Sequence, residues 1–176
     1  MSTLNSTQSS SEANSYVAST AEADGIAVTL KALAGLGVDT SGWEAASTAS
    51  KTEALVLAAR AVDSISFVGD PTTETQSMAF PRVYMPKMTD EDVIPDSVKM
   101  AQVAEACAML SSRAADPVAR AIARGITSES AGGVSFTVGN TKNTAADRGI
   151  SQPTFDILRK AGLIRPAATS VYNGRG

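Results

Sequence analysis

Apolar residues recur at helical spacing along much of this chain, and that periodicity constrains the fold more than any other feature of the sequence. Similar stripes run through residues 23–33 and 100–110. Because an amphipathic helix buries its apolar face against another element, the pattern predicts a mainly α fold, a small helical bundle. The clearest stripe, on one helix face, comprises Leu55, Ala58, Ala59, Val62 and Ile65.

Capping residues mark the expected ends of these helices. Ser19 with Glu22, and Ser50 with Glu53, have the spacing at which a hydroxyl and a glutamate satisfy free amides at a helix start. Pro95 fits the first position of a third helix. Trp43, the only tryptophan, is predicted to anchor the core. A short fourth helix is expected between Asp116-Pro117 and Gly125, and a last one from Pro153 to the terminator Gly162.

Two segments interrupt the helical pattern. Residues 69–95 contain Pro71, Pro81 and Pro86 besides Pro95, which excludes a long helix and predicts an ordered loop that protrudes. Residues 126–139 alternate Val134, Phe136 and Val138 after a Gly-Gly turn. This alternation predicts a minor β-hairpin or single strand beside the helices.

The two ends of the chain differ in charge. Residues 1–15 are mostly Ser, Thr, Asn and Gln, which predicts a flexible N-terminal arm. Residues 142–176 carry six basic and two acidic side chains, so their net charge is +4, and the rest of a chain of net charge -3 carries -7. The sequence therefore divides into the arm, a helical core over 16–141, and a basic C-terminal segment suited to an acidic partner surface.

The residue inventory excludes most enzyme chemistries. The chain has no histidine and a single cysteine, Cys107, which lies in an apolar run typical of a buried thiol. The acidic cluster at Asp90, Glu91, Asp92 and Asp96 lacks the spacing of a calcium loop and indicates a solvated turn. We therefore expect no enzymatic activity, no metal and no cofactor. No signal peptide or membrane span is indicated, so synthesis in the cytoplasm is expected.

The composition also bears on nucleic-acid binding. Aromatic residues make up only 5% of the chain, which leaves few rings to stack on bases. Arg113, Arg120 and Arg124 could face a DNA groove, but ion pairing with the acidic body is the favoured interpretation.

Several short segments, taken in order, resemble the head-tail connector (adaptor, or head-completion) proteins of tailed bacteriophages, some of which are described as DnaT-like single-strand DNA-binding proteins. The resemblance covers roughly residues 16–165. This chain has Phe80 where the family usually has Trp. The segments are Trp43-Glu44-Ala45-Ala46-Ser47, Ala54-Leu55-Val56-Leu57-Ala58-Ala59-Arg60, Met78-Ala79-Phe80-Pro81-Arg82 and Ile94-Pro95.

The resemblance implies a non-enzymatic virion protein, made in the host cytoplasm and placed at the head-tail interface. Twelve copies would form a ring between the portal protein and a tail or nozzle protein. Genomic DNA would pass through the channel without sequence-specific binding, and no membrane is involved. The alternatives are a single-strand DNA-binding replication protein and a small regulator that binds through helix-in-groove contacts.

Within this hypothesis, residues 142–176 form the portal-docking segment. Its apolar side chains would anchor it and its arginines would set register against acidic portal groups. We expect the segment to have little core of its own and to be mobile in the free monomer. The predicted portal-binding residues are Phe155, Leu158, Arg159, Leu163, Arg165 and Arg175.

Overall fold

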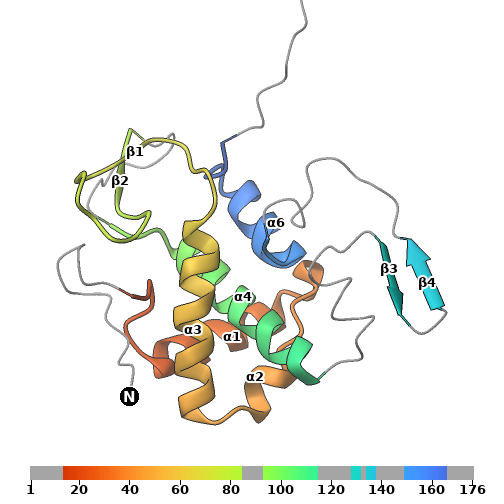
Figure 1. Cartoon of the computed structure of the whole chain (residues 1–176). Coiled ribbons are helices and arrows are strands. Elements are labelled where there is room, and N and C mark those ends of the chain that lie inside the picture. Colours follow the sequence, from red (N-terminus) through yellow and green to blue (C-terminus); the bar gives the residue numbers. More distant parts are fainter. Residues whose placement is uncertain (1–13, 85–92, 115–127, 132–133, 138–148, 166–176) are drawn as a thin grey trace, which may run out of the picture.

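The computed structural model describes residues 14–84, 93–114, 128–131, 134–137 and 149–165 (Figure 1). It confirms the mainly α fold with a minor β element. The helices are α1 (Thr20–Ala32), the 3₁₀ turn η1 (Ala34–Leu36), α2 (Ser41–Ala45), α3 (Thr48–Asp63), α4 (Asp96–Ala114) and α6 (Gln152–Lys160). Two antiparallel pairs join β1 (Asp70–Pro71) to β2 (Arg82–Val83) and β3 (Ser128–Ala131) to β4 (Val134–Thr137). The expected helix at 116–125 lies outside the described residues.

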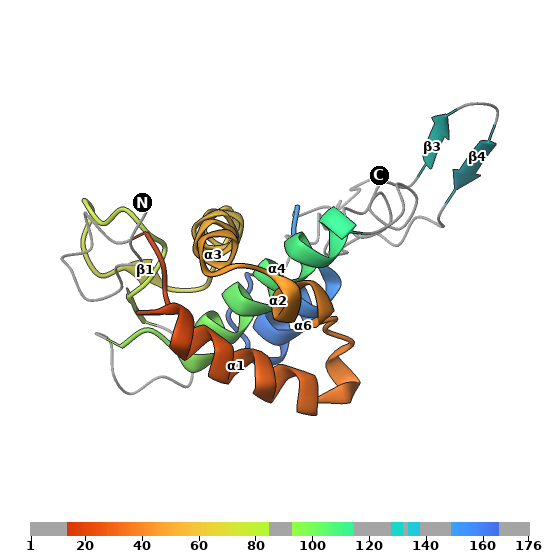
Figure 2. The same ribbon diagram turned by 90° about the horizontal axis from the view of Figure 1, so that it is seen from below.

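Helix α4 forms the centre of the molecule. Helices α1, α2, α3 and α6 all pack on it (Figure 2). Its middle turns are buried on every side, as expected of a helix enclosed by others rather than one with a single apolar stripe. The buried residues include Val98, Ala101, Gln102, Val103, Ala104, Glu105, Ala106, Cys107 and Leu110.

The helix starts agree only partly with the sequence prediction. Ser19 caps α1 as expected, with its hydroxyl accepting from the Glu22 amide at 3.1 Å, although the Glu22 carboxylate reaches back to Ala18 rather than to Ser19. The start of α3, expected at Ser50, was predicted wrongly. Helix α3 begins earlier than Ser50, because the hydroxyl of Ser47 caps it by accepting from the Ser50 amide at 3.2 Å.

Pro95 precedes α4 instead of occupying its first position. The helix begins at Asp96, and the Pro95 carbonyl accepts hydrogen bonds from the amides of Val98 and Lys99. Proline has no backbone N–H to donate, so it suits both the position before a helix and the first position within it. The consequence for packing is small, since the predicted stripe is buried from Val103 to Leu110 and only its first residue, Met100, is half-buried.

Helix α2 approaches α4 very closely. A Cβ atom on Gly42 would lie 2.5 Å from the backbone nitrogen of Ser111, so only glycine fits between the two helices. Next to it, Trp43 is 2% exposed, which confirms the predicted core anchor. One carboxylate oxygen of Asp24 accepts from both the Trp43 indole at 2.9 Å and the Lys51 ammonium at 2.8 Å. This cluster joins α1, α2 and α3.

The loop between α3 and α4 is organised by polar contacts. The Arg82 guanidinium donates to the carbonyls of Val68, Gly69 and Ala79. The Phe80-Pro81 peptide bond is cis, and Phe80 is buried against the rings of Tyr16 and Phe67. The loop predicted to protrude is thus attached to the core around Phe80 and Arg82. Protrusion of the rest of the loop stays a prediction.

Helix α6 belongs to the same core as the other helices. It packs on α4, and the buried carboxylate of Glu105 accepts from the Ser151 amide at 2.8 Å, at the start of α6. The expectation that the segment after residue 142 has little core of its own is therefore wrong for residues 150–163. None of the described helices is both long and apolar enough to cross a membrane.

Candidate interaction surface at the end of helix α6

The three apolar residues predicted to anchor a portal are core residues of this chain. Phe155 is 5% exposed, Leu158 0% and Leu163 3%. Their side chains pack inside the bundle, so they are not available as surface anchors, and that part of the prediction is corrected. The error has a simple cause, because an apolar stripe that packs against the same chain has the same spacing as one that packs against a partner.

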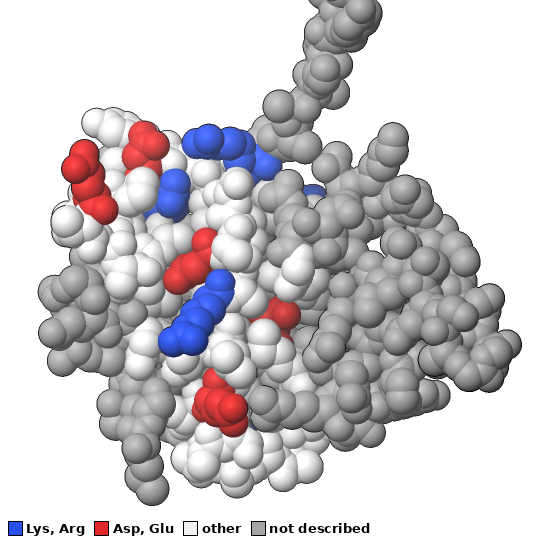
Figure 3. All heavy atoms as spheres, in the orientation of Figure 1, with Lys and Arg blue, Asp and Glu red and all other residues white. Residues whose placement is uncertain are grey.

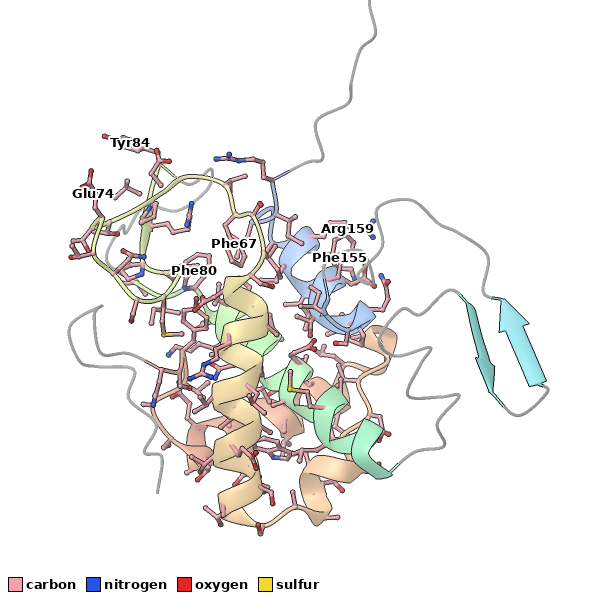
Figure 4. All side chains as sticks on the ribbon, in the orientation of Figure 1. Phe67, Glu74, Phe80, Tyr84, Phe155 and Arg159 are labelled. Atoms are coloured by element: carbon pink, nitrogen blue, oxygen red, sulfur yellow. The ribbon has the colours of Figure 1, made fainter. Side chains whose placement is uncertain are left out.

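Unlike these apolar residues, the predicted arginines that the structure describes lie at the surface. Arg159 is exposed, lies 3.3 Å from Asp156, and stacks over the Phe155 ring with its guanidinium carbon 5.6 Å from the centroid (Figure 4). The adjacent Lys160 is also exposed. Both stand in the last turn of α6, where cations interact favourably with the helix dipole.

Residues that follow α6 continue this surface. The amide of Arg165 donates to the Ser66 carbonyl and the amide of Val68 donates to the Leu163 carbonyl, both at 2.9 Å. These bonds flank a bridge between Phe67 and Ile164 and hold Arg165 at the surface. Arg175 lies outside the described residues.

Arg165 also lies close to Arg82 of the neighbouring loop. Burial lowers the pKa of the Arg82 guanidinium, Asp70 opposes that effect, and the charge of Arg165 adds to it. Figure 3 shows basic side chains at this end of the molecule, with acidic side chains farther along the same edge. We call Arg159, Lys160 and Arg165 the basic end. Its cations come from α6 and from the segment after it, and the Phe67–Ile164 bridge holds the segment that carries Arg165.

Lysines of the helical body also have carboxylate partners. Lys31 lies 2.6 Å from Glu44 and Lys51 lies 2.8 Å from Asp24. Hydrogen bonding to Lys51 lowers the pKa of Asp24, and hydrogen bonding to Lys31 lowers that of Glu44. A third pair joins Lys99 to Glu22 at 2.9 Å. The ion pairing predicted for Arg113, Arg120 and Arg124 is a separate matter and stays a prediction.

A buried polar junction lies at the N-terminal end of the fold, and no pattern in the sequence indicated it. Gln102 accepts from the amides of Tyr16 and Val17 and donates to the Ser15 hydroxyl and the Leu55 carbonyl. The Tyr16 hydroxyl donates to Asp63, whose same oxygen accepts from the Ala79 amide at 3.0 Å. Burial raises the pKa of the Asp63 carboxyl, although both donors oppose the shift. Residues 15–17 are thus part of the core, whereas the flexible arm was expected to extend to residue 15.

Exposed aromatic surface is scarce in the part of the chain that the structure describes. Tyr84 is 79% exposed and has a positive φ of 57°. The buried aromatic residues are Tyr16, Trp43, Phe67, Phe80 and Phe155. A row of rings on which successive bases could stack is therefore not formed by these residues.

The remaining candidates of the sequence analysis give no site. Within the described ranges, no three His, Cys, Asp or Glu side chains come together in a way that could hold a metal ion. Asp90, Glu91 and Asp92 lie outside those ranges, as do Arg120 and Arg124. Cys107 is buried, and burial raises the pKa of its thiol to about 12, so the thiol stays protonated at neutral pH.

A protein-family model matches most of this chain. The model of a family described as "Putative DnaT-like ssDNA binding protein" matches residues 3–172. No curated protein and no solved structure matches the chain. The match spans nearly the whole sequence, including the buried N-terminal junction and the basic end. This chain therefore belongs to the DnaT-like family.

Proposed function

We propose that this protein is a structural head-tail connector of a tailed bacteriophage. It forms a ring between portal and tail, lines the channel through which DNA leaves the head, and has no catalytic role. Copies made in the host cytoplasm assemble at the head-tail interface of the virion, where they contact the portal protein and a tail or nozzle protein.

The placement of charge is the observation that supports this proposal. Arg159, Lys160 and Arg165 are exposed on α6 and on the segment that follows it, so this part of the surface presents positive charge. A small group of exposed cations suits an acidic patch on a protein partner better than it suits a long phosphate backbone, which needs a track of cations. The apolar anchors first assigned to this contact are excluded by their burial, so the contact is mainly polar.

Single-strand DNA binding is the second candidate. The family description supports it more directly than it supports a connector. Against it, the described aromatic side chains other than Tyr84 are buried or turned into the core. A DNA-binding role would rest on the basic end and on residues that the structure does not describe.

A portal-binding assay tests the first candidate. Wild-type protein should decorate purified portal rings of its phage, and the double variant Arg159→Ala/Lys160→Ala should bind about tenfold more weakly, since each exposed ion pair contributes up to about 1 kcal/mol. The matched control is Lys31→Ala/Arg60→Ala, which removes the same charge from exposed positions of the body. Equal loss in both variants would attribute the effect to net charge rather than to the basic end.

A salt titration separates the two candidates. Affinity for a fluorescent oligothymidine should be weak if the protein is a connector. A DNA-binding protein that neutralises several phosphates would lose affinity steeply between about 50 and 200 mM salt. Tight, salt-sensitive binding without portal decoration would exclude the connector function.

A further inference from the structure

A short segment before α1 lies inside the core without being part of a helix or a strand. We call Ser15, Tyr16 and Val17 the strap, and all three residues are fully buried. The amides of Tyr16 and Val17 donate to the same side-chain oxygen of Gln102 in α4, at 2.9 and 3.2 Å. The strap is thus held in place by side chains of other elements.

Tyr16 connects the strap to the loop between α3 and α4. Its hydroxyl donates to Asp63 at the end of α3, and the same carboxylate oxygen accepts from the Ala79 amide. Its ring packs edge-on against Phe80, with the two centroids 5.9 Å apart and the ring planes at 82°. Displacement of Tyr16 would therefore remove a polar and an aromatic partner from the same stretch of the loop.

Phe67 extends this contact to the segment after α6. Its ring packs against Phe80 with the centroids 4.8 Å apart (Figure 4). Phe67 also forms the antiparallel bridge with Ile164. Both phenylalanines are buried, at 3% and 2% exposure. Buried contacts therefore run without interruption from Tyr16 to Ile164.

Two backbone hydrogen bonds flank the bridge and reach the basic end. The Val68 amide donates to the Leu163 carbonyl, and the Arg165 amide donates to the Ser66 carbonyl, both at 2.9 Å. These bonds hold the backbone that carries Arg165. The placement of this cation thus depends on the position of residues 66–68, which pack on the strap through Phe80.

We propose that the strap controls the order of the basic end. When the strap is seated, Tyr16 keeps Phe80 and Phe67 packed, and the segment with Arg165 is held. When the strap is released, the loop and residues 163–165 open with it, while α4 and the helices packed on it stay folded. The strap is thus a conformational device with two states.

Partial release of this unit is unfavourable. The buried side chain of Gln102 would lose the strap amides as partners, and a buried amide group without partners is costly. The rings of Phe80 and Phe67 would border the space that Tyr16 leaves, and such cavities are also costly. Contiguous contacts of this kind open as one cooperative unit.

Native-state hydrogen exchange of the full-length wild-type protein tests the shared opening. In low concentrations of urea, the amides of this unit should exchange through one opening with a single free energy and a single urea dependence. Amides in the middle of α4 should exchange only through a larger opening. The amides to compare are those of Tyr16, Val17, Val68, Ala79 and Arg165.

Two results of this experiment would overturn the proposal. Strap amides that open at a different free energy from those of Val68 and Arg165 would show that the two regions are independent. Exchange of all these amides only through global unfolding would show that a released state is not populated.

A substitution in the strap tests the direction of control. Tyr16→Ala removes the contacts to Phe80 and Asp63, so the amides of Val68 and Arg165 should exchange at least about tenfold faster. The control Leu110→Ala also removes a large buried side chain, but on the part of α4 that packs against α2. It should lower global stability and leave these two amides unchanged. Equal acceleration in both variants would overturn the proposal.

Tyr16→Phe separates the polar contact from the aromatic one and preserves the core if Tyr16→Ala fails to fold. The ring on Phe80 is kept and only the hydrogen bond to Asp63 is lost. The Ala79 amide should exchange faster, whereas the Arg165 amide should change less than about twofold, because the rings carry the coupling beyond the loop. Equal acceleration of both amides would contradict that role of the rings.

Coupling between two sites is reciprocal, so a partner that binds the ordered basic end should also keep the strap seated. This step rests on the proposed connector function. In wild-type protein bound to purified portal rings of its phage, the amides of Tyr16 and Val17 should exchange several-fold more slowly than in the free protein. Portal decoration without slower exchange would overturn the coupling and leave the connector function intact. A shared opening in the free protein without portal decoration would overturn the connector function and leave the coupling intact.

Discussion

A few buried polar side chains determine how the start of the chain is held. Gln102 uses both ends of its amide, accepting from the amides of Tyr16 and Val17 and donating to Ser15 and Leu55. Since a buried amide without partners is costly, this complete set of bonds fixes one position for the N-terminal residues. Asp63 provides a second attachment, because its carboxylate accepts hydrogen bonds from the Tyr16 hydroxyl and from the amide of Ala79 in the following loop.

Asp63 should make stability depend on pH in a specific direction. Burial raises the pKa of its carboxyl in the folded state above the unfolded value of about 3.9. The folded state therefore favours the protonated form, and the associated stability is fully present below about pH 3.9 and lost as pH rises through the folded pKa. Asp63→Asn keeps the accepting oxygen but cannot titrate, so its stability relative to wild type should rise with pH.

Urea unfolding of both proteins between about pH 4 and pH 8 measures this difference. The other shifted carboxyls, Glu22, Asp24, Asp39 and Glu44, have lowered pKa values and stabilise the fold above their unfolded pKa values. They are common to both proteins and cancel in the comparison. Parallel stability curves would show that the Asp63 carboxyl does not titrate differently in the folded and unfolded states.

At the scale of elements, close packing of α2 on α4 depends on one missing side chain. A Cβ atom at Gly42 would lie 2.5 Å from the Ser111 nitrogen and 2.7 Å from the Leu110 carbonyl carbon, and backbone atoms cannot move aside independently. Gly42→Ala should therefore force the helices apart and cost about 1 to 3 kcal/mol of unfolding free energy. Thermal and urea denaturation would measure that cost.

Gly25 provides the matched control for this substitution. It lies inside α1, and a Cβ atom there would meet nothing within 4 Å. Gly25→Ala should stabilise the protein by about 0.4 to 1 kcal/mol, because alanine reduces the entropy of the unfolded chain and favours helix. Similar effects of the two substitutions would mean that the contact at Gly42 relaxes easily.

The sequence predicted which segments are helical better than where they begin. The stripe from Leu55 to Ile65 is buried as expected, since helical periodicity alone determines it. The start of α3 was missed because Ser47 and Ser50 are both acceptable caps, and their hydroxyls lie only 3.0 Å apart in the folded protein. A capping motif that consists of one hydroxyl residue and one acidic residue cannot decide which of two neighbouring serines begins the helix.

For the molecule as a whole, the sequence alone did not show which apolar residues belong to the core and which to a contact surface. The apolar residues of α6 predicted equally well a docking helix and a core helix, and only the packing on α4 decides between them. The junction of Tyr16, Asp63 and Gln102 joins positions far apart in the sequence, so no local pattern announces it. By contrast, the exposed cations at 159, 160 and 165 follow from charge alone.

Because α6 completes the core, removing it should unfold the whole described bundle rather than release a docking segment. A chain ending at residue 150 loses Phe155, Ile157, Leu158 and Leu163, each of which is at most 6% exposed. Losing one such side chain typically costs about 2 to 5 kcal/mol, so losing four costs about 8 to 20 kcal/mol, as much as the usual total stability of about 5 to 15 kcal/mol for a small domain. A chain ending at residue 165 keeps this core and should unfold cooperatively.

Two probes of the same unfolding transition check this expectation. Trp43 is the single tryptophan and is buried against α4, far along the sequence from α6, so its fluorescence reports on the body, while circular dichroism at 222 nm reports on all helices. Both signals should show one coincident transition in the chain ending at 165 and none in the chain ending at 150. If Trp43 kept a cooperative transition without α6, the body would be an independent folding unit, and the C-terminal segment could act as the separate docking element that its charge first indicated.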